Sequence, residues 1–587
     1  MRHPARTGLA LLVGALAGLA VWAGAAVAAP GDSTGKVQTR YAKERRLCRA
    51  PRPRRASCLA VKLTRAAAGT PGARQYELAA GARSKGPAGG LTPADLASAY
   101  SFSTASGGGQ TVAIVDAWDD PRIEKDLSTF DSNYGLPACT TANGCFEKVG
   151  QTGSTSALPS PDTSGWSVEI SLDVETVHGV CPNCKIVLVE ADSESDSDLA
   201  AATNEAVALG ANEVSNSYGG LEGEEEEEPQ DVAAYDHPGV VIVASSGDEG
   251  YLNWEEIEEF APAPERPDAP ASYPSVVSVG GTSLKLTGKG VRKSETVWNN
   301  SGQPNANGTF KHAKQFIATG GGCSLEFTAP AWQQQAAGWS ATGCGTHRAS
   351  ADVSAVGDPY TGFDIYSSYK YEAFAETGWM TIGGTSLSAP LVSGMFALAG
   401  GSHFVGYPAE TLYQHLGDSH MLFDVTQGGN GYCDDESPSA CGEPEANERN
   451  GNVDCMGTTA CDAAPGYDAP SGVGAPIGLG AFGGSSLTGP PTVVTGRATE
   501  REGGAALLNA TVNPNGGEVS SCTFEYGPGT TLTQSVPCSS SPGAGDVPVG
   551  VSAHLSGLTP KSAYRFRITA SSAAGTSTGK TKKFKAH

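Results

Sequence analysis

Positive charge is scarce in this sequence. Lys and Arg number 39 against 62 Asp and Glu, so the formal net charge is -23 at pH 7. So acidic a chain repels polyanions, which argues against nucleic acid and against anionic membranes as partners. Charged residues make up only 17% of the 587 residues, whereas hydrophobic residues make up 39%, enough to fill a large buried core.

Long apolar runs are missing after the first thirty residues, and no later segment is apolar enough to cross a bilayer. At the N-terminus, Arg2 and Arg6 precede an apolar stretch over residues 9–21, and Ala-Val-Ala at 26–28 offers a small-residue cleavage site. This pattern predicts a signal peptide over residues 1–29 and therefore a secreted, extracellular protein that leaves the membrane after cleavage. The alternative is an uncleaved signal anchor.

No odd cysteine is left over among the fourteen. Most of them have a near neighbour in sequence, which predicts local disulfides formed in an oxidising compartment. Cys181 and Cys184 could also suggest a redox or zinc site, but no second CxxC or histidine pair lies nearby to complete a metal shell. The predicted pairs are Cys48/Cys58, Cys139/Cys145, Cys181/Cys184, Cys323/Cys344 and Cys522/Cys538, and a group of four stays open: Cys433, Cys441, Cys455 and Cys461.

The few basic residues crowd into one segment. Arginines from Arg45 to Arg65 stand in a region with almost no acids, which ends in a flexible stretch over residues 85–90. A basic segment can bind nucleic acid, but in an exported chain we interpret residues 30–90 as a short pro-segment that docks electrostatically on the acidic body. Thr92 and Pro93 then predict the capped start of a helix.

Continuous apolar runs alternate with helical segments over residues 91–480. Such runs predict an α/β fold with a parallel sheet covered by helices on both faces, and active sites in such sheets lie at the carboxyl ends of the strands. The predicted strands are Thr111–Val115, Lys185–Val189, Glu213–Ser217, Val240–Ala244 and Val276–Val279.

The pattern changes after a glycine- and proline-rich linker over residues 481–491. Residues 492–587 show alternating strands, and Leu558-Thr559-Pro560 followed by Tyr564 is typical of the tyrosine corner of a β-sandwich. This all-β tail resembles a fibronectin type III module. The resemblance implies a second domain that binds a surface or a polymer.

Ser386 is the candidate nucleophile. Gly384-Thr385-Ser386 precedes an apolar helix with Pro390 in its first turn, and backbone N–H groups at a helix start stabilise negative charge that develops beside them. A second Gly-Thr-Ser, at residues 281–283, continues as a strand instead and is interpreted as structural.

A serine needs a base to accept its proton. The histidine-based alternative is a subtilisin-type triad of Asp116, His178 and Ser386, whose order in the chain fits. His178 stands at the far end of its helix, however, and we interpret it as structural. Near the start of that helix, Glu169 and Asp173 lie on one face. Two neighbouring carboxyls there can share one proton, so that one is the ionised base and the other is its protonated partner.

Asp248 is the third candidate. It follows the apolar strand that ends near Ala244, where a donor to an oxyanion is needed, and a protonated aspartic acid can donate. An ordinary turn residue is the alternative.

In their order these motifs resemble the sedolisin, or serine-carboxyl peptidase, family, which has a subtilisin-like fold. By that resemblance Ser386 attacks the peptide carbonyl, Glu169 takes its proton and Asp173 supports Glu169. Asp248 stabilises the oxyanion, and Ser217, Tyr218 and Gly219 pair with the substrate backbone as an added strand. The resemblance implies a monomeric endopeptidase, active at acid pH, with proteins or peptides as substrates.

The resemblance also implies a Ca2+ site. Its ligands would be the carboxylates of Asp424 and Asp468 and the carbonyl groups of Val425, Ala464 and Gly466, an all-oxygen set that suits calcium. The family's pro-segment is usually a longer folded domain, and the cysteine-rich insertion between residues 433 and 461 splits the two ligand segments. The rival from a different class is a non-catalytic secreted binding protein that acts through its C-terminal module.

Overall fold

The computed structural model describes most of the chain after residue 39. The described residues are 40–49, 54–67, 70, 73–76, 86–223, 229–253, 266–300, 317–370, 376–403, 405–431, 455, 457–483, 490–501, 503–514, 519–543, 549–572 and 575–586. The predicted signal peptide, Cys433 and Cys441 lie outside these residues. Among the described residues, no helix has both the length and the apolar character that a bilayer crossing requires.

A largely parallel sheet forms the centre of the first folded region. Its strand order is β14-β13-β10-β8-β5-β7-β6, with β17 beside β13, and only the β13–β14 pair is antiparallel among these strands. The apolar runs form these strands as predicted, and the observed bounds differ from the predicted ones by a few residues. The strands are β5 (Thr111–Ala117), β6 (Phe146–Gly150), β7 (Lys185–Ala191), β8 (Glu213–Asn216), β10 (Val241–Ser245), β13 (Val277–Leu286), β14 (Arg292–Val297) and β17 (Val353–Val356).

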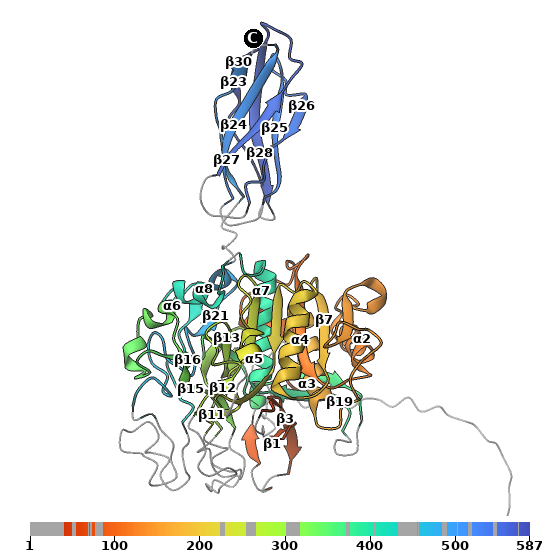
Figure 1. Cartoon of the computed structure of the whole chain (residues 1–587), viewed down its shortest axis with the longest axis vertical. Helices are drawn as coiled ribbons and strands as arrows, with labels where there is room; N and C mark the ends of the chain where they lie inside the picture. The colour runs from red at the N-terminus through yellow and green to blue at the C-terminus, as the bar shows by residue number, and fades with distance from the viewer. Residues whose placement is uncertain are drawn as a thin grey trace, which may run out of the picture. The chain divides into compact units, whose positions relative to one another are not determined.

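Helices pack along this sheet (Figure 1). Helices α3 and α7 contact one another and the central strand β5, and α4 packs against β5, β7 and β8. The side chains of β5 from Val112 to Val115 are fully buried, as expected for a strand with cover on both faces. The helices are α1 (Pro93–Ala99), α2 (Ile123–Tyr134), α3 (Trp166–Val180), α4 (Asp196–Ala208), α5 (Pro229–Ala233), α6 (Ala331–Gln334), α7 (Thr385–Ala399) and α8 (Ala409–Gln414). The predicted α/β fold, a largely parallel sheet with helices packed along it, is thus confirmed.

Thr92 caps α1 as predicted. Its hydroxyl accepts the N–H of Asp95, and the Asp95 carboxylate accepts the N–H of Thr92, which is a complete capping box. One detail of the sequence analysis needs correction. Helix α7 begins at Thr385, so Pro390 lies inside the helix and not in its first turn.

The basic N-terminal segment is built into the first folded region as strands. Strands β1 (Arg40–Arg46), β3 (Val61–Ala66) and β4 (Arg74–Tyr76) join β18 (Phe363–Ser367) and β19 (Gly378–Gly383) in a five-stranded sheet of order β18-β19-β3-β1-β4. Ion pairs add to this pairing: Arg46 with Glu249 at 2.6 Å, and Lys62 with Glu376. The segment is therefore held by backbone hydrogen bonds as well as by charge.

Short strands flank the main sheet. A three-stranded sheet of order β12-β9-β2 and another of order β11-β15-β16 lie on the described part of the chain, together with the pair β20–β21. Their bounds are β2 (Ser57–Cys58), β9 (Tyr218–Leu221), β11 (Glu249–Tyr251), β12 (Asp268–Ala269), β15 (Ala318–Thr328), β16 (His347–Ser350), β20 (Leu422–Phe423) and β21 (Ala475–Pro476). The core of this region extends to Phe482, which packs on Phe396 with ring centroids 4.7 Å apart, just beyond the predicted domain boundary.

The C-terminal region is a two-sheet β-sandwich with a hydrophobic core of its own. One sheet holds β22 (Thr492–Thr495), β23 (Thr499–Arg501), β24 (Ala505–Asn513) and β27 (Val549–Leu555); the other holds β25 (Val519–Pro528), β26 (Gln534–Pro537), β28 (Ala563–Ser572), β29 (Gly575–Thr578) and β30 (Lys582–Lys585). The Tyr564 hydroxyl accepts the backbone N–H of Thr559 at 3.0 Å, which is the predicted tyrosine corner.

Six disulfides lie on the described residues. All five predicted local pairs form, and the sixth joins Cys455 to Cys461 within the group that the sequence left open. Cys181 and Cys184 form a structural disulfide, as predicted.

Candidate active site

The predicted acid pair lies on α3, a helix that is buried along its whole length. Glu169 and Asp173 are one turn apart and both are fully buried. Burial raises the pKa of Glu169 well above its ordinary value, and the charge of Asp173 raises it further. Burial also raises the pKa of Asp173, whereas the nearby Ser217 hydroxyl lowers it. The two carboxyls therefore hold protons to a higher pH than exposed carboxyls do.

Ser386 occupies the first turn of α7 and is fully buried. Its hydroxyl donates to the carbonyl oxygen of Ser217 at 3.3 Å. Neither carboxylate oxygen of Glu169 has a hydrogen-bond partner among the described residues. The Ser386 hydroxyl is nevertheless close enough to lower the pKa of Glu169. A small movement of either side chain would complete a hydroxyl-to-carboxylate contact, as is common before substrate binds.

Asp248 lies after the carboxyl end of β10, in a turn that Gly247 enters with φ 110°. One carboxylate oxygen accepts both the backbone N–H and the hydroxyl of Thr385, each at 2.8 Å, and this ties Asp248 to the start of α7. The other oxygen, Oδ2, is buried and without a hydrogen-bond partner in the described part of the chain. Burial and the nearby charge of Glu249 raise the pKa of Asp248 well above its ordinary value.

The four predicted catalytic residues therefore meet in one buried place. Asp173, Ser386 and Asp248 each act on the pKa of Glu169, although the four residues come from α3, α7 and the loop after β10. The combination offers a hydroxyl nucleophile, a carboxyl pair that can take up its proton, and a carboxyl that can donate to an oxyanion.

The residues that were predicted to pair with a substrate lie beside another part of the chain. Tyr218 and Gly219 belong to β9, directly after Ser217, and β9 pairs antiparallel with β2: Ser57 lies opposite Gly219 and Cys58 opposite Tyr218. An extended chain therefore already lies along the edge where the sequence analysis placed a substrate.

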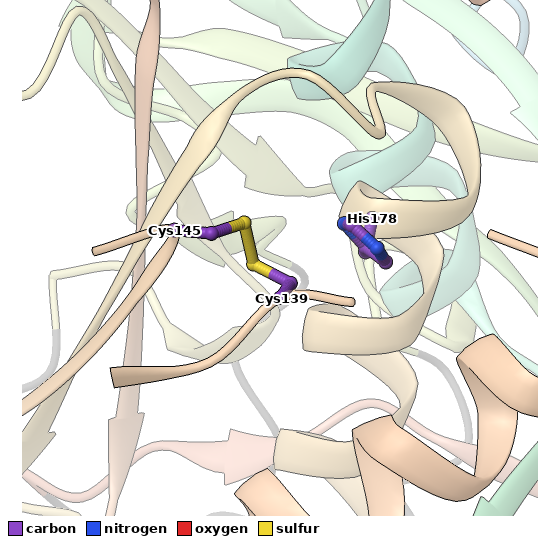
Figure 2. Close-up of side chains that lie close together, drawn as sticks. All are labelled: Cys139, Cys145 and His178. Atoms are coloured by element: carbon purple, nitrogen blue, oxygen red, sulfur yellow. A yellow bond between two sulfur atoms is a disulfide. The ribbon is translucent and has the colours of Figure 1, made fainter. Parts of the chain in front are cut away.

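His178 lies away from this cluster. It stands in the last turn of α3, where its Nε2 is 2.9 Å from the carbonyl oxygen of Pro137 and 3.2 Å from Asp131. Figure 2 shows its ring beside the Cys139–Cys145 disulfide. These three side chains are close enough for a metal site, but disulfide-bonded sulfurs cannot supply thiolates. His178 therefore lies at the opposite end of α3 from Glu169.

The five predicted calcium ligands come together in two adjoining loops. The Asp424 carboxylate accepts the N–H of Gly466 at 3.2 Å, and Asp468 accepts the N–H of Ala464 at 3.0 Å. The Ser471 hydroxyl lies 2.6 Å from Asp468 and 3.5 Å from the carbonyl oxygen of Val425, which ties the loops together. Burial raises the pKa of Asp468 to about 7, and the charge of Asp424 contributes to this rise. Two carboxylates that repel one another beside backbone carbonyls fit a hard divalent cation.

The sequence analysis missed one acid near the centre. Asp116, at the end of β5, is fully buried, and neither carboxylate oxygen has a hydrogen-bond partner among the described residues. Burial raises its pKa, and the charges of Asp173 and Glu169 raise it further. Its position at the carboxyl end of a central strand was the available signal, but the sequence analysis considered Asp116 only with His178.

Known proteins match this architecture. The family model described as the subtilase family matches residues 152–436. Xanthomonalisin of Xanthomonas sp. (strain T-22) is 29% identical over 391 residues, which is 60% of this chain and 44% of the relative. Kumamolisin of Bacillus sp. (strain MN-32) is 30% identical over 354 residues, which is 58% of this chain and 57% of the relative. The chain thus spans about half the length of the curated relatives that it matches.

A solved structure agrees. Pseudomonas sedolisin, a serine-carboxyl proteinase complexed with two molecules of pseudo-iodotyrostatin, superposes with a TM-score of 0.51 at 27% identity, over 67% of this chain and 96% of that one. Fold, site and matches together define a protein of the subtilisin-like class. Within that class, the chain is similar to sedolisin, kumamolisin and xanthomonalisin, and the solved sedolisin is a serine-carboxyl proteinase.

Proposed function

We propose that this protein is a secreted endopeptidase that cleaves peptide bonds through an acyl-enzyme on Ser386. The observation that carries the proposal is the meeting of Ser386, the Glu169/Asp173 pair and Asp248 in one buried cluster beside the edge strand β9. The position of His178, at the other end of α3 beside a disulfide, argues against the histidine-based alternative.

The chemistry follows from the protonation states. The pair shares one proton, which Asp173 carries, so that ionised Glu169 can take the hydroxyl proton while the Ser386 oxygen bonds to the substrate carbonyl carbon. Protonated Asp248 donates from Oδ2 to the oxyanion. When the peptide C–N bond breaks, Glu169 returns the proton to the leaving amine. Water then attacks the acyl-enzyme by the same route, and the Ser386 hydroxyl is restored.

Acid activity follows from the role of Asp248. Its pKa is raised by burial and by Glu249, so it keeps its proton at a higher pH than an exposed aspartic acid does. As the pH rises through this pKa, Asp248 becomes an anion that repels the developing oxyanion. Activity should therefore be high at acid pH and fall toward neutral pH.

A calcium ion would bind at Asp424 and Asp468, with the carbonyl oxygens of Val425, Ala464 and Gly466 completing an oxygen shell. There it would supply positive charge that offsets the repulsion between the two carboxylates and so stabilise the loops. We assign no catalytic step to it.

The remaining parts of the proposal rest on sequence patterns. The signal-like N-terminus and the local disulfides support export, and the β-sandwich with its tyrosine corner supports a fibronectin type III-like module that binds a surface or polymer. The peptidase acts as a monomer on proteins or peptides.

The decisive experiment measures casein hydrolysis against pH for the wild type and for Ser386→Ala. Ser283→Ala is the matched control, because Ser283 lies on β13 in the second Gly-Thr-Ser, where its hydroxyl donates to Asp358. We expect Ser386→Ala to lose at least 10³-fold in kcat/KM, as removal of a nucleophile does, and Ser283→Ala to stay within threefold, as is usual away from a catalytic site. A calcium chelator should lower the Tm. Equal casein hydrolysis by Ser386→Ala would end the proposal.

A further inference from the structure

Charge is divided unevenly between the two sheets of the C-terminal sandwich. The strands β22, β23, β24 and β27 of one sheet hold one arginine, Arg501, and one acid, Glu500. The strands β25, β26, β28, β29 and β30 of the other, here called the basic sheet, hold one acid, Glu525, and five basic residues. These are Arg565, Arg567, Lys582, Lys583 and Lys585. The basic sheet is therefore positive, although the whole chain has a formal net charge of -23 at pH 7.

The alternation of burial along the strands places most of these cations on one face. Every second residue of β28 from Tyr564 to Ala570 packs into the core of the sandwich. Successive side chains of a strand point to opposite faces, so Arg565 and Arg567 lie on the outer face. On β30 the ring of Phe584 is buried in the same way, and Lys583 and Lys585 are exposed on either side of it. Four cations thus share the outer face of the basic sheet.

The pairing of β28 with β30 brings these cations together. Lys583 lies directly opposite Arg565, and Lys585 lies opposite Ala563. Neighbouring strands are about 4.8 Å apart, and alternate residues of one strand are about 6.8 Å apart. The exposed Lys561 lies at the end of β30, because its N–H donates to the carbonyl oxygen of Ala586 at 2.8 Å. Like charges at such spacing repel one another, and a polyanion that lies across them would relieve this repulsion.

The single acid of the basic sheet does not balance this charge. Glu525 lies opposite Arg567 on the neighbouring strand and forms an ion pair with it at 2.5 Å. The residue that lies opposite Arg565 on the same strand is Gly527. Arg565 and Lys583 therefore face each other across β28 and β30, with no acid at either neighbouring register position that the structure describes.

The rest of the outer face carries hydroxyl groups. The hydroxyls of Thr569 and Thr578 lie 3.4 Å apart, and those of Ser571 and Thr576 lie 2.8 Å apart, on the paired strands β28 and β29. Each hydroxyl can both donate and accept a hydrogen bond, as the hydroxyl groups of a sugar do. The outer face therefore combines a cationic end with rows of groups that can pair with a carbohydrate.

Two other classes of polyanion fit this face less well. Single-stranded nucleic acids bind by stacking their bases on exposed aromatic rings, whereas the rings nearest to the cations are buried: Tyr564, Phe566 and Phe584. Binding to an anionic membrane needs apolar side chains beside the cations. Beyond Arg567, the outer residues of β28 are instead Thr569 and Ser571.

We infer that the outer face of the basic sheet is a binding surface for an anionic polysaccharide. The charged groups of the polymer would lie across Arg565, Lys583 and Lys585, and its sugar hydroxyls along the paired hydroxyls of β28 and β29. The inference rests on the proposed binding role of the C-terminal module and names the chemistry of its ligand. Because the proposed peptidase works at acid pH, the acidic groups of the polymer are of a kind that stays ionised there, as sulfate esters do and carboxylates do not.

Salt dependence gives a quantitative expectation. A cation that neutralises a charge of a polyanion releases a condensed counterion, which contributes about 0.7–0.9 to the slope of log affinity against log salt concentration. Three contacts, from Arg565, Lys583 and Lys585, therefore predict a slope of about -2 to -3. The hydroxyl rows add hydrogen bonds that do not depend on salt.

The test uses the full-length protein with Ser386→Ala, so that it cannot digest itself. Fluorescent dextran sulfate is titrated at acid pH and followed by anisotropy. Neutral dextran and carboxymethyl dextran of the same length are the matched polymers, since the first has no charge and the second loses its charge in acid. We expect both to bind at least tenfold more weakly than dextran sulfate.

Two pairs of substitutions locate the surface in the same background. Arg565→Gln/Lys583→Gln should raise the Kd for dextran sulfate at least tenfold and reduce the salt slope by about 2. Lys125→Gln/Lys289→Gln, at two exposed lysines outside the sandwich, removes the same charge and should stay within twofold. Thr569→Ala/Thr578→Ala should raise the Kd about threefold and leave the salt slope unchanged, because it removes hydrogen bonds and no charge. Thermal melts check that each variant is folded.

The results that would overturn the inference are distinct. Dextran sulfate binding that survives Arg565→Gln/Lys583→Gln, or that neutral dextran matches, would refute a cationic polysaccharide surface. Tighter binding of single-stranded DNA or of phosphatidylserine vesicles under the same conditions would assign the face to another class of partner. Casein hydrolysis by the wild type judges the peptidase separately: its absence, with polymer binding intact, ends the proposed catalysis and leaves this inference standing.

Discussion

Pro390 affects the backbone hydrogen bonding of Ser386, which lies four residues before it in α7. Proline has no N–H, so the carbonyl oxygen of Ser386 loses its helical hydrogen bond. The Ser217 hydroxyl lies 3.5 Å from that oxygen and supplies a long hydrogen bond in its place. Ser386 in turn donates to the Ser217 carbonyl. The nucleophile and the edge strand are thus linked in both directions, and a shift of one should move the other.

Also at the residue scale, the base can be tested against its rival. Glu169→Gln keeps the shape of the side chain but cannot take up a proton, so kcat should fall by at least 10³-fold. His178→Ala removes the histidine of the alternative triad and should leave kcat within about threefold, because the ring lies against Pro137 and Asp131. Both are measured on a peptide substrate at acid pH, with circular dichroism as the folding check. Activity lost in His178→Ala but retained in Glu169→Gln would contradict the assignment.

Individual site residues were predictable where chemistry and spacing coincide. Glu169 and Asp173 at one-turn spacing, and Ser386 at a helix start, stand out in the sequence, and the structure brings them together. Asp116 was considered only as the partner of His178, because a lone aspartate at a strand end has many uses. Its closeness to Asp173 depends on how α3 packs on β5, and sequence spacing does not encode that packing.

At the scale of elements, the turn into α7 limits the size of the side chain that one residue can carry. Gly384 needs a positive φ and also lacks space for a side chain. Gly384→Ala should therefore displace the adjacent Leu59 carbonyl and lose at least 10²-fold in kcat/KM. Gly239→Ala is the control: its φ is 93°, but no atom lies within 4 Å of an added Cβ, so only the backbone strain of about 1–2 kcal/mol applies.

The comparison needs thermal melts and kinetics together. Gly239→Ala should lower the Tm slightly and leave kcat/KM unchanged. If both variants behave alike, strain alone accounts for the effect and the carbonyl of Leu59 is not held against Gly384.

Elements differed in how far the sequence could predict them. The buried strands of the main sheet were found because continuous apolar runs suffice to identify them. The N-terminal strands were not, since β2 and β3 are held by β9 and β19, partners more than 150 residues further along the chain. Sequence analysis recognised a basic segment that docks by charge, but its backbone pairing with the site depends on contacts that no local pattern records.

At the scale of the whole molecule, buried acids make stability depend on pH. Asp120 is an example: burial raises its pKa from 3.8 to about 7. Around it lie Asp119, Asp126, Lys148 and Glu190. A raised pKa means that the folded state binds protons more tightly than the unfolded state, so stability is full below pH 3.8 and is lost as the pH rises toward 7.

We therefore expect the Tm, measured by calorimetry at constant calcium concentration, to fall between pH 4 and pH 7. Asp120→Asn should flatten part of that fall, up to roughly 4 kcal/mol at the upper limit of about 1.4 kcal/mol for each pKa unit. The exposed Asp192→Asn should leave the slope unchanged. A Tm that rises over this range would show that acids with lowered pKa values dominate instead.

Because β2, which pairs with β9, belongs to the same chain as the catalytic groups, diluting the protein cannot separate them. A short tether fixes a local, effective concentration on the order of millimolar, whatever the protein concentration in the tube. Every external peptide or aldehyde must compete with that constant. Dissociation constants of all ligands that bind along β9 should therefore be larger by one common factor while β2 is paired there, and they should fall in parallel in a variant without this pairing.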